Sequence, residues 1–116
     1  MPDRLGDDVR LKYILDAISS IEEYTSSVSF EEFQIERMRK DATLRQLEII
    51  GEATSRLSTQ LKADHPSVDW SSIIGLRNLV IHEYFGVDLN TVWNIIKQDI
   101  PPFRSTIEIL HQDHKN

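Results

Sequence analysis

Apolar residues recur every three or four positions along almost the whole chain, which is the spacing of a buried face on an α-helix. In the first part of the chain this face comprises Leu11, Ile14, Leu15, Ile18 and Ile21. Further along it comprises Leu47, Ile50, Thr54, Leu57 and Leu61. Only four glycines and four prolines interrupt the 116 residues, and no useful length of alternating apolar and polar residues suggests a strand. The sequence therefore predicts an all-α, up-down bundle of four to five helices.

Capping residues indicate where the first helices begin. A first helix is expected from Asp8 to about Ser26, with Asp7 or Asp8 as its N-cap. Ser29 and Glu32 have the spacing of a capping box, in which a hydroxyl and a carboxylate three residues later satisfy free backbone N–H groups. A second helical stretch is expected from Phe30, and apart from bends nothing in the sequence stops it before Lys62.

Prolines and glycines divide the second half of the chain. Residues 63–67 are expected to form a loop, because the residue before Pro66 is driven out of the helical region. Asp69 can cap a helix running from Trp70 to near Gly86, and Asp88 or Asn90 can start the next. The prolines at 101–102 should kink or break the chain before the last turns, and residues 110–116 should form a frayed tail.

Size, charge and cysteine content exclude several classes of protein. A chain of 116 residues fits one domain, 1–116, and the lack of cysteine excludes disulfides, thiolate zinc sites and cysteine nucleophiles. The formal net charge of −6 argues against a general phosphate-coating protein, although a local basic site remains open. No apolar run could span a membrane, and the acidic N-terminus does not resemble a signal peptide, so we expect a cytoplasmic protein.

One otherwise apolar segment, 75–86, carries four chemically capable side chains: Arg77, Asn78, His82 and Tyr84. Any one of them could be structural, but four together indicate a site in a central helix. On a straight α-helix Arg77 and Tyr84 lie within about 20° of each other, whereas Asn78 and His82 share a second face about 140° away. Either the helix distorts near Gly86, or a two-fold homodimer brings two copies of Arg77 and His82 to one cleft.

These four residue types suit attack on a phosphodiester. Histidine can withdraw or donate a proton near neutral pH, and arginine binds phosphate oxygens and the charge that builds up in the transition state. Tyrosine can bind phosphate or stack on a base, and asparagine can hold the histidine tautomer. RNA supplies its own 2′-hydroxyl nucleophile, and the sequence shows no paired-carboxylate cluster for magnesium, so we expect neither a metal nor another cofactor.

The same segment and its flanks resemble the HepT-like toxins of the HEPN superfamily. The motif is Arg77-x4-His82-x-Tyr84 with Asn78 directly after the arginine. Residues 41–53 resemble the long central helix of that family, 68–78 resemble its lead-in to the motif, and 84–101 match the segment that follows. The resemblance covers most of the chain from about residue 30 onward.

The resemblance implies a helical homodimer that acts as a metal-independent endoribonuclease, the toxin half of a type VII-like toxin–antitoxin pair. It implies that Arg77 and His82 are catalytic, that Asn78 supports them, and that Tyr84 belongs to the site. The implied antitoxin is an MntA-type nucleotidyltransferase that silences the toxin by attaching AMP to Tyr84. Two alternatives are a non-catalytic HEPN module that binds nucleotides or the nucleotidyltransferase, and a purely structural bundle.

Three other charged groups have two readings each. The segment 36–45 has a local net charge of +2 and could guide RNA, but a solvated helix face is the favoured reading. Arg45, Glu48 and Glu52 could form structural ion pairs, which we favour, or lie opposite the motif. His111 and His114 have the spacing of a metal pair but lack a third ligand, so we expect no metal there.

Overall fold

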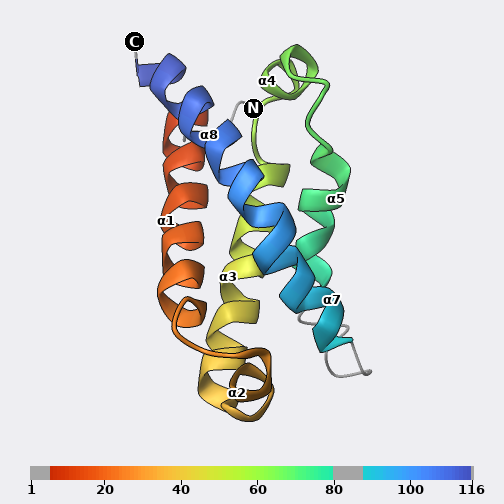
Figure 1. Cartoon of the computed structure of the whole chain (residues 1–116). Helices are drawn as coiled ribbons and strands as arrows, with labels where there is room; N and C mark the ends of the chain where they lie inside the picture. Colours follow the sequence, from red (N-terminus) through yellow and green to blue (C-terminus); the bar gives the residue numbers. More distant parts are fainter. Residues whose placement is uncertain (1–5, 80–87, 116) are drawn as a thin grey trace.

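The computed structural model describes residues 6–79 and 88–115, and all regular structure in these ranges is helical, as predicted (Figure 1). Three long rods dominate: α1 (Asp7–Thr25), α3 (Arg37–Ser55), and a C-terminal rod made of α7 (Leu89–Asn94), the π-helical turn η2 (Ile95–Asp99) and α8 (Ile100–Lys115). Shorter helices complete the bundle: α2 (Phe30–Ile35), α4 (Thr59–Asp64), and α5 (Trp70–Ile74) with the 3₁₀ turn η1 (Gly75–Asn78). None of these helices in the described ranges is long and apolar enough to cross a membrane.

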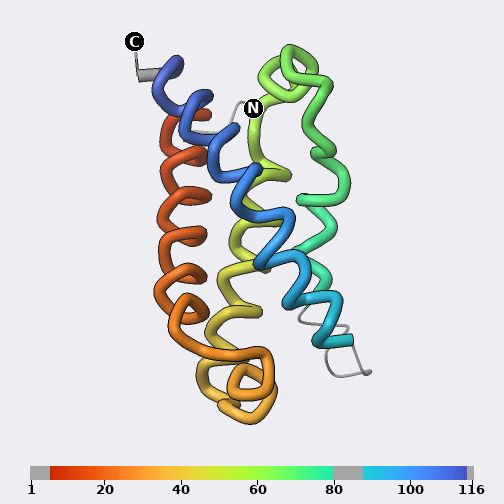
Figure 2. Tube along the Cα trace, viewed as in Figure 1, coloured from red at the N-terminus to blue at the C-terminus, as the bar shows by residue number. Residues whose placement is uncertain are grey.

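The core lies where α1, α3 and α8 meet. α3 runs between α1 and α5, and α8 crosses in front of them on a diagonal (Figures 1 and 2). Both predicted apolar faces are confirmed, since every residue in them is buried except Leu15, which is partly buried against the same core. α8 contributes Phe103, Ile107 and Leu110 to this core. Burial of these side chains provides the main driving force for folding.

The expected continuous helix from Phe30 to Lys62 is wrong, because it is divided into α2, α3 and α4. The capping box at Ser29 is confirmed, with the Glu32 N–H donating to Ser29 Oγ at 3.1 Å. Glu36 leaves the helical region with ψ of 88° and separates α2 from α3. Ser58 adopts an extended backbone and its hydroxyl caps α4 by accepting from Leu61 N–H. Local capping therefore outweighs the helical periodicity at Ser58, whereas at Glu36, which makes no side-chain cap, the non-helical backbone itself ends α2.

The predicted aspartate cap of α1 is also corrected. α1 begins after Gly6, which has no side-chain capping bond. Asp7 instead accepts hydrogen bonds from Ser58 N–H at 2.8 Å and Ser58 Oγ–H at 2.6 Å. Its carboxylate therefore joins the start of α1 to the break before α4, a long-range contact that local spacing could not reveal.

The prolines at 101–102 do not break the chain, since α7, η2 and α8 follow one another without a gap. The π-helical turn directly before them explains why: an i→i+5 turn is wider, so the carbonyls that would meet the proline rings are moved aside. Asp88 is the cap that starts this rod, accepting from Asn90 N–H at 2.9 Å. At its other end α8 remains helical to Lys115, through the tail that was expected to fray.

Candidate active site

The segment that carries the motif is anchored at its start by Asp69. Its carboxylate accepts from Ser72 N–H at 3.2 Å, Ser72 Oγ–H at 2.6 Å and Ser71 Oγ–H at 3.1 Å, which confirms the predicted cap of α5. The hydrogen bonds from Ser72 hold the pKa of Asp69 below its usual value of 3.8. Trp70 follows, buried, with its indole N–H donating to the His65 carbonyl at 3.0 Å and its ring edge-on to Phe103. The entry into the motif is thus fixed at two consecutive residues.

The helix changes geometry at the motif. α5 ends at Ile74 and residues Gly75–Asn78 form a 3₁₀ turn, with three residues per turn in place of 3.6. The angles expected for a straight α-helix therefore do not apply at Arg77 and Asn78. The distortion near Gly86, one of the two predicted alternatives, lies outside the described residues, as do His82 and Tyr84.

Residues 75–79, the described part of this segment, are not central to the bundle, where a central helix was predicted. Arg77 and Asn78 are exposed, while Leu76 in the same turn is buried in the core. α3 occupies the central position, with α5 and η1 packed on one side of it (Figure 1). The exposed positions explain why charged and amide groups are tolerated here without buried partners.

A glycine on α3 determines how closely the motif approaches. A Cβ added at Gly51 would lie 2.5 Å from the Arg77 backbone nitrogen and 2.9 Å from the Ile74 carbonyl oxygen. Both distances are shorter than any real Cβ contact and both are to backbone atoms, so neither neighbour can rotate away. α3 and η1 therefore meet backbone to backbone at Gly51, which is a close approach that only glycine permits.

The side chain of Arg77 reaches the residue next to this glycine. Arg77 Nη1 lies 3.7 Å from Glu52 Oε2, and the two side chains are 45% and 49% exposed. The same carboxylate accepts from Arg56 Nε–H at 3.1 Å. Water screens pairs this exposed, so the contact with Glu52 orients Arg77 and adds little to stability.

The sequence left two interpretations of Arg45, Glu48 and Glu52: structural ion pairs, or a position opposite the motif. The structure agrees with both. Arg45 and Glu48 form an ion pair through Nη1 and Oε1. All three also line the pocket beside the motif, the reading that sequence disfavoured. Their spacing along the sequence predicts that they share one face of α3. That this face lies opposite Arg77 follows only from the position of η1 in the fold.

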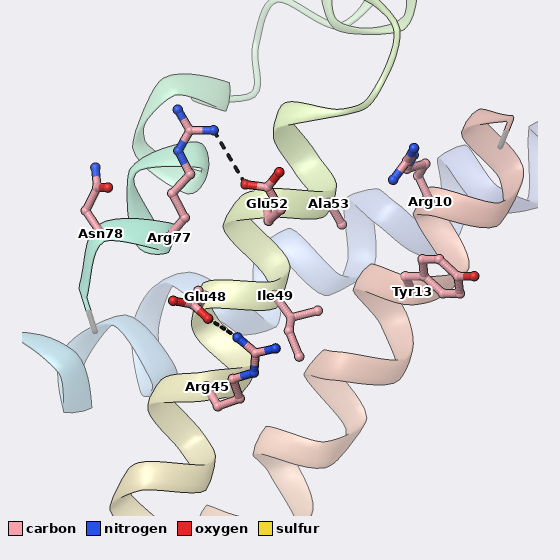
Figure 3. A pocket seen from close by; sticks show the side chains of 9 residues that line it. All are labelled: Arg10, Tyr13, Arg45, Glu48, Ile49, Glu52, Ala53, Arg77 and Asn78. Carbon is pink, nitrogen blue, oxygen red and sulfur yellow. Dashed lines mark hydrogen bonds and ion pairs between the residues drawn. The ribbon is translucent and has the colours of Figure 1, made fainter. Parts of the chain in front are cut away.

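A pocket of about 410 Å³ lies between α1, α3 and η1 (Figure 3). Arg77 and Asn78 lie on one side, and Arg10 and Tyr13 of α1 lie on the other. The floor comes from α3 and comprises Arg45, Glu48, Ile49, Glu52 and Ala53. Sequence reasoning missed Arg10 and Tyr13, since no motif marks two polar residues three positions apart on the outer face of α1.

The basic segment 36–45 is engaged mainly in pairs of its own. Arg39 Nε donates to Glu36 at 2.7 Å and its Nη1 donates to the Tyr24 carbonyl at 2.5 Å, while Arg37 lies 3.9 Å from Asp41. Of the segment's basic residues, Arg45 is the one that lines the pocket. This geometry agrees with the favoured reading of a solvated helix face. Within 6–79 and 88–115, no three His, Cys, Asp or Glu side chains converge as metal ligands would.

Comparison with known proteins adds a family to this geometry. Residues 14–110 match the family described as "Ribonuclease HepT-like". The chain is 37% identical over 97 residues to "Putative RNase MJ1380" of Methanocaldococcus jannaschii, covering 84% of this chain and 89% of that protein. It is 38% identical over 102 residues to "Probable ribonuclease HepT" of Thermococcus cleftensis, covering 88% and 93%.

A third relative shows the same region as part of a longer protein. The chain is 35% identical over 109 residues to "Gamma-glutamylcyclotransferase and putative RNase MJ0434" of Methanocaldococcus jannaschii, covering 93% of this chain but 49% of that protein. No solved structure matches the chain. The family match spans most of the sequence, and with the all-α bundle it establishes that this chain belongs to the HepT-like ribonuclease family of the HEPN superfamily.

Proposed function

We propose that this protein is a metal-independent endoribonuclease, the cytoplasmic toxin of a type VII-like toxin–antitoxin pair, acting as a homodimer with Arg77 and His82 as its catalytic residues. The observation that carries the proposal is the position of Arg77 and Asn78, exposed side by side on a 3₁₀ turn at the rim of a pocket. Membership of the HepT-like family and relatives named as ribonucleases support the same activity.

The proposed reaction uses the 2′-hydroxyl of RNA as nucleophile. His82 takes the 2′-hydroxyl proton as the oxygen attacks phosphorus, and the bond to the 5′-oxygen breaks. The departing 5′-oxygen takes a proton from the second His82 of the dimer, which leaves a 2′,3′-cyclic phosphate and a 5′-hydroxyl end. Arg77 binds the phosphate oxygens and the negative charge that develops on them, and Asn78 supports the orientation of His82.

The contact between Arg77 and Glu52 fits this role. Both side chains are about half exposed, so an incoming phosphate can replace the Glu52 carboxylate at the guanidinium without breaking a buried pair. The guanidinium points to the Glu52 carboxylate, which itself lines the pocket (Figure 3). This arrangement gives Arg77 a defined resting position at small energetic cost.

Silencing is proposed to occur at Tyr84, through AMP attached by an MntA-type nucleotidyltransferase. Tyr84 follows Arg77 by seven positions in the same motif, so an adenylate attached to Tyr84 is proposed to reach the Arg77 guanidinium. A bound adenylate would bring a phosphate to the place that an RNA phosphate would occupy. The antitoxin would then compete with substrate through the same electrostatic attraction that Arg77 exerts on RNA.

The first experiment measures cleavage of total RNA by the chain expressed without its genomic neighbour, with EDTA present throughout. We expect cleavage by the wild type and its loss, by at least about a hundredfold, in Arg77→Ala and His82→Ala. Arg56→Ala and His65→Ala are matched controls: Arg56 shares the Glu52 carboxylate but does not line the pocket, and His65 lies in a loop. Equal activity in the wild type and His82→Ala would overturn the mechanism.

The second experiment records the intact mass of the chain expressed with and without its neighbour. A gain of one or more AMP units that disappears in Tyr84→Phe and persists in Tyr24→Phe would support silencing at Tyr84. A mass gain that persists in Tyr84→Phe would place the modification elsewhere. A wild type that cuts no RNA but forms a stable complex with the neighbour would favour the binding-module alternative, which the net charge of −6 also suits.

A further inference from the structure

The pocket beside Arg77 extends beyond the motif residues, over α3 as far as α1. Its volume of about 410 Å³ lies in the range of sites that hold small molecules. Arg77 is at one side, and the pocket continues over α3 to Arg10 and Tyr13 (Figure 3). If the scissile phosphate binds at Arg77, this pocket is within reach of the nucleoside attached to that phosphate.

The charges that line the pocket are mixed, and this argues for a base in place of a second phosphate. Three arginines, Arg10, Arg45 and Arg77, accompany two glutamates, Glu48 and Glu52. Carboxylates repel phosphate but accept hydrogen bonds from the N–H groups of a nucleobase. Glu48 is the more withdrawn from water, with its side chain 26% exposed against 49% for Glu52. A hydrogen bond to Glu48 is therefore less weakened by competing water.

The remaining lining offers a surface on which a base can stack. Tyr13 is 46% exposed, and it lies across the pocket from Arg77 (Figure 3). Ile49 and Ala53 lie on the α3 floor between them. Aromatic rings bind unstacked bases of single-stranded RNA, because every base has a flat apolar face.

We propose that this pocket binds a guanine next to the scissile phosphate, with Tyr13 stacking on the base and the Arg45–Glu48 pair reading its edge. Guanine presents two adjacent N–H donors, N1 and N2, which one carboxylate can accept together, beside the O6 and N7 acceptors that arginine recognises. Adenine and cytosine offer one amino group to Glu48, and uracil one ring N–H. The inference rests on the proposed ribonuclease function and adds to it the base that sets where RNA is cut.

The test is sequencing of the RNA ends that the wild type produces from a random-sequence single-stranded RNA. We expect guanine to be enriched about tenfold or more at one of the two positions flanking the cut. Glu48→Gln should remove most of this enrichment, because it replaces one of the two acceptor oxygens by an NH₂ donor and removes the charge. Tyr13→Leu should lower affinity about tenfold for every sequence. Asp41→Asn is the matched control: it also neutralises an ion-paired acid of α3, but outside the pocket, and it should retain the enrichment.

The outcomes separate this inference from the function on which it rests. Cleavage without a flanking preference, a preference for another base, or a guanine preference that survives Glu48→Gln would each overturn it while leaving the ribonuclease intact. If the wild type cuts no RNA, the ribonuclease proposal fails, and titration of the protein with the four nucleoside monophosphates still tests the pocket. Tighter binding of GMP that is lost in Glu48→Gln would support the guanine site, and equal binding of all four would overturn it.

Discussion

α3 holds its two neighbours in different ways, and the candidate pocket lies between them. On one side α1 packs on α3 through buried aliphatic side chains of both helices. On the other side η1 meets α3 at Gly51, where a single added carbon would touch backbone nitrogen and oxygen. A side-chain junction relaxes partly when an atom is removed, whereas a backbone junction can take an added atom only if the two elements move apart. The first therefore determines whether the bundle folds, and the second determines where Arg77 lies.

The largest expected effect is on stability, at the α1–α3 junction. Ile14 is fully buried in this junction, while its neighbour Tyr13 is 46% exposed. Ile14→Ala should lower the free energy of unfolding by about 2–5 kcal/mol, since it removes buried methyl groups and leaves a cavity. Tyr13→Ala should change it far less. Urea denaturation at one fixed protein concentration measures both, and a greater loss in Tyr13→Ala than in Ile14→Ala would show that the packing is misassigned.

At the α3–η1 junction we expect a smaller effect on stability than at the α1–α3 junction, but a larger effect on RNA cleavage. Gly51→Ala should cost about 1–3 kcal/mol, because α3 and η1 must separate by several tenths of an ångström. The same shift moves Arg77 relative to Glu52 and the pocket, so RNA cleavage should fall even where the variant remains folded.

Gly75 provides the matched control for this substitution. It belongs to the same contact region, but a Cβ added there meets nothing within 4 Å, and its φ of −61° suits alanine. Gly75→Ala should therefore leave stability unchanged or slightly raised, with cleavage retained. Equal loss of cleavage in Gly51→Ala and Gly75→Ala would mean that flexibility of the turn, and not close approach, is what the glycines provide.

The two junctions also differ in how far the sequence could predict them. The apolar spacing of α1 and α3 identified the residues of the first junction, because a buried helical face must be apolar whatever it packs against. The second junction could not be predicted: Gly51 looks like any glycine within a helical pattern, and its partner is 26 positions away at Arg77.

The same distinction holds for capping and for the pocket. Caps at Ser29, Asp69 and Asp88 depend on neighbours two or three residues away; the first two were predicted, and Asp88 was one of two candidates with Asn90. The breaks of the 30–62 stretch and the role of Asp7 depend partly on contacts across the fold, and these were missed. The candidate pocket combines both cases: the motif marks Arg77 and Asn78, whereas Arg10 and Tyr13 join them only through the position of α1.

The smallest expected effect concerns the cap that leads into η1, and it depends on pH. Hydrogen bonds from Ser72 lower the folded-state pKa of Asp69 below its usual value of 3.8, so the ionised carboxylate stabilises the folded chain. This contribution is fully present above the unfolded-state pKa and is lost as the pH falls through the lower folded-state pKa. Asp69→Asn keeps an acceptor at the N-cap but cannot ionise. The melting temperature of the wild type should therefore exceed that of Asp69→Asn near neutral pH, and the gap should close in acid.

A carboxyl titration followed by NMR gives the direct measurement: the Asp69 midpoint should lie below 3.8 in the wild type and rise in Ser72→Ala, which lacks the hydroxyl donor. A wild-type midpoint at or above 3.8 would show that the serines do not hold this carboxylate, and that the entry into η1 is fixed by Trp70 and Gly51 without it.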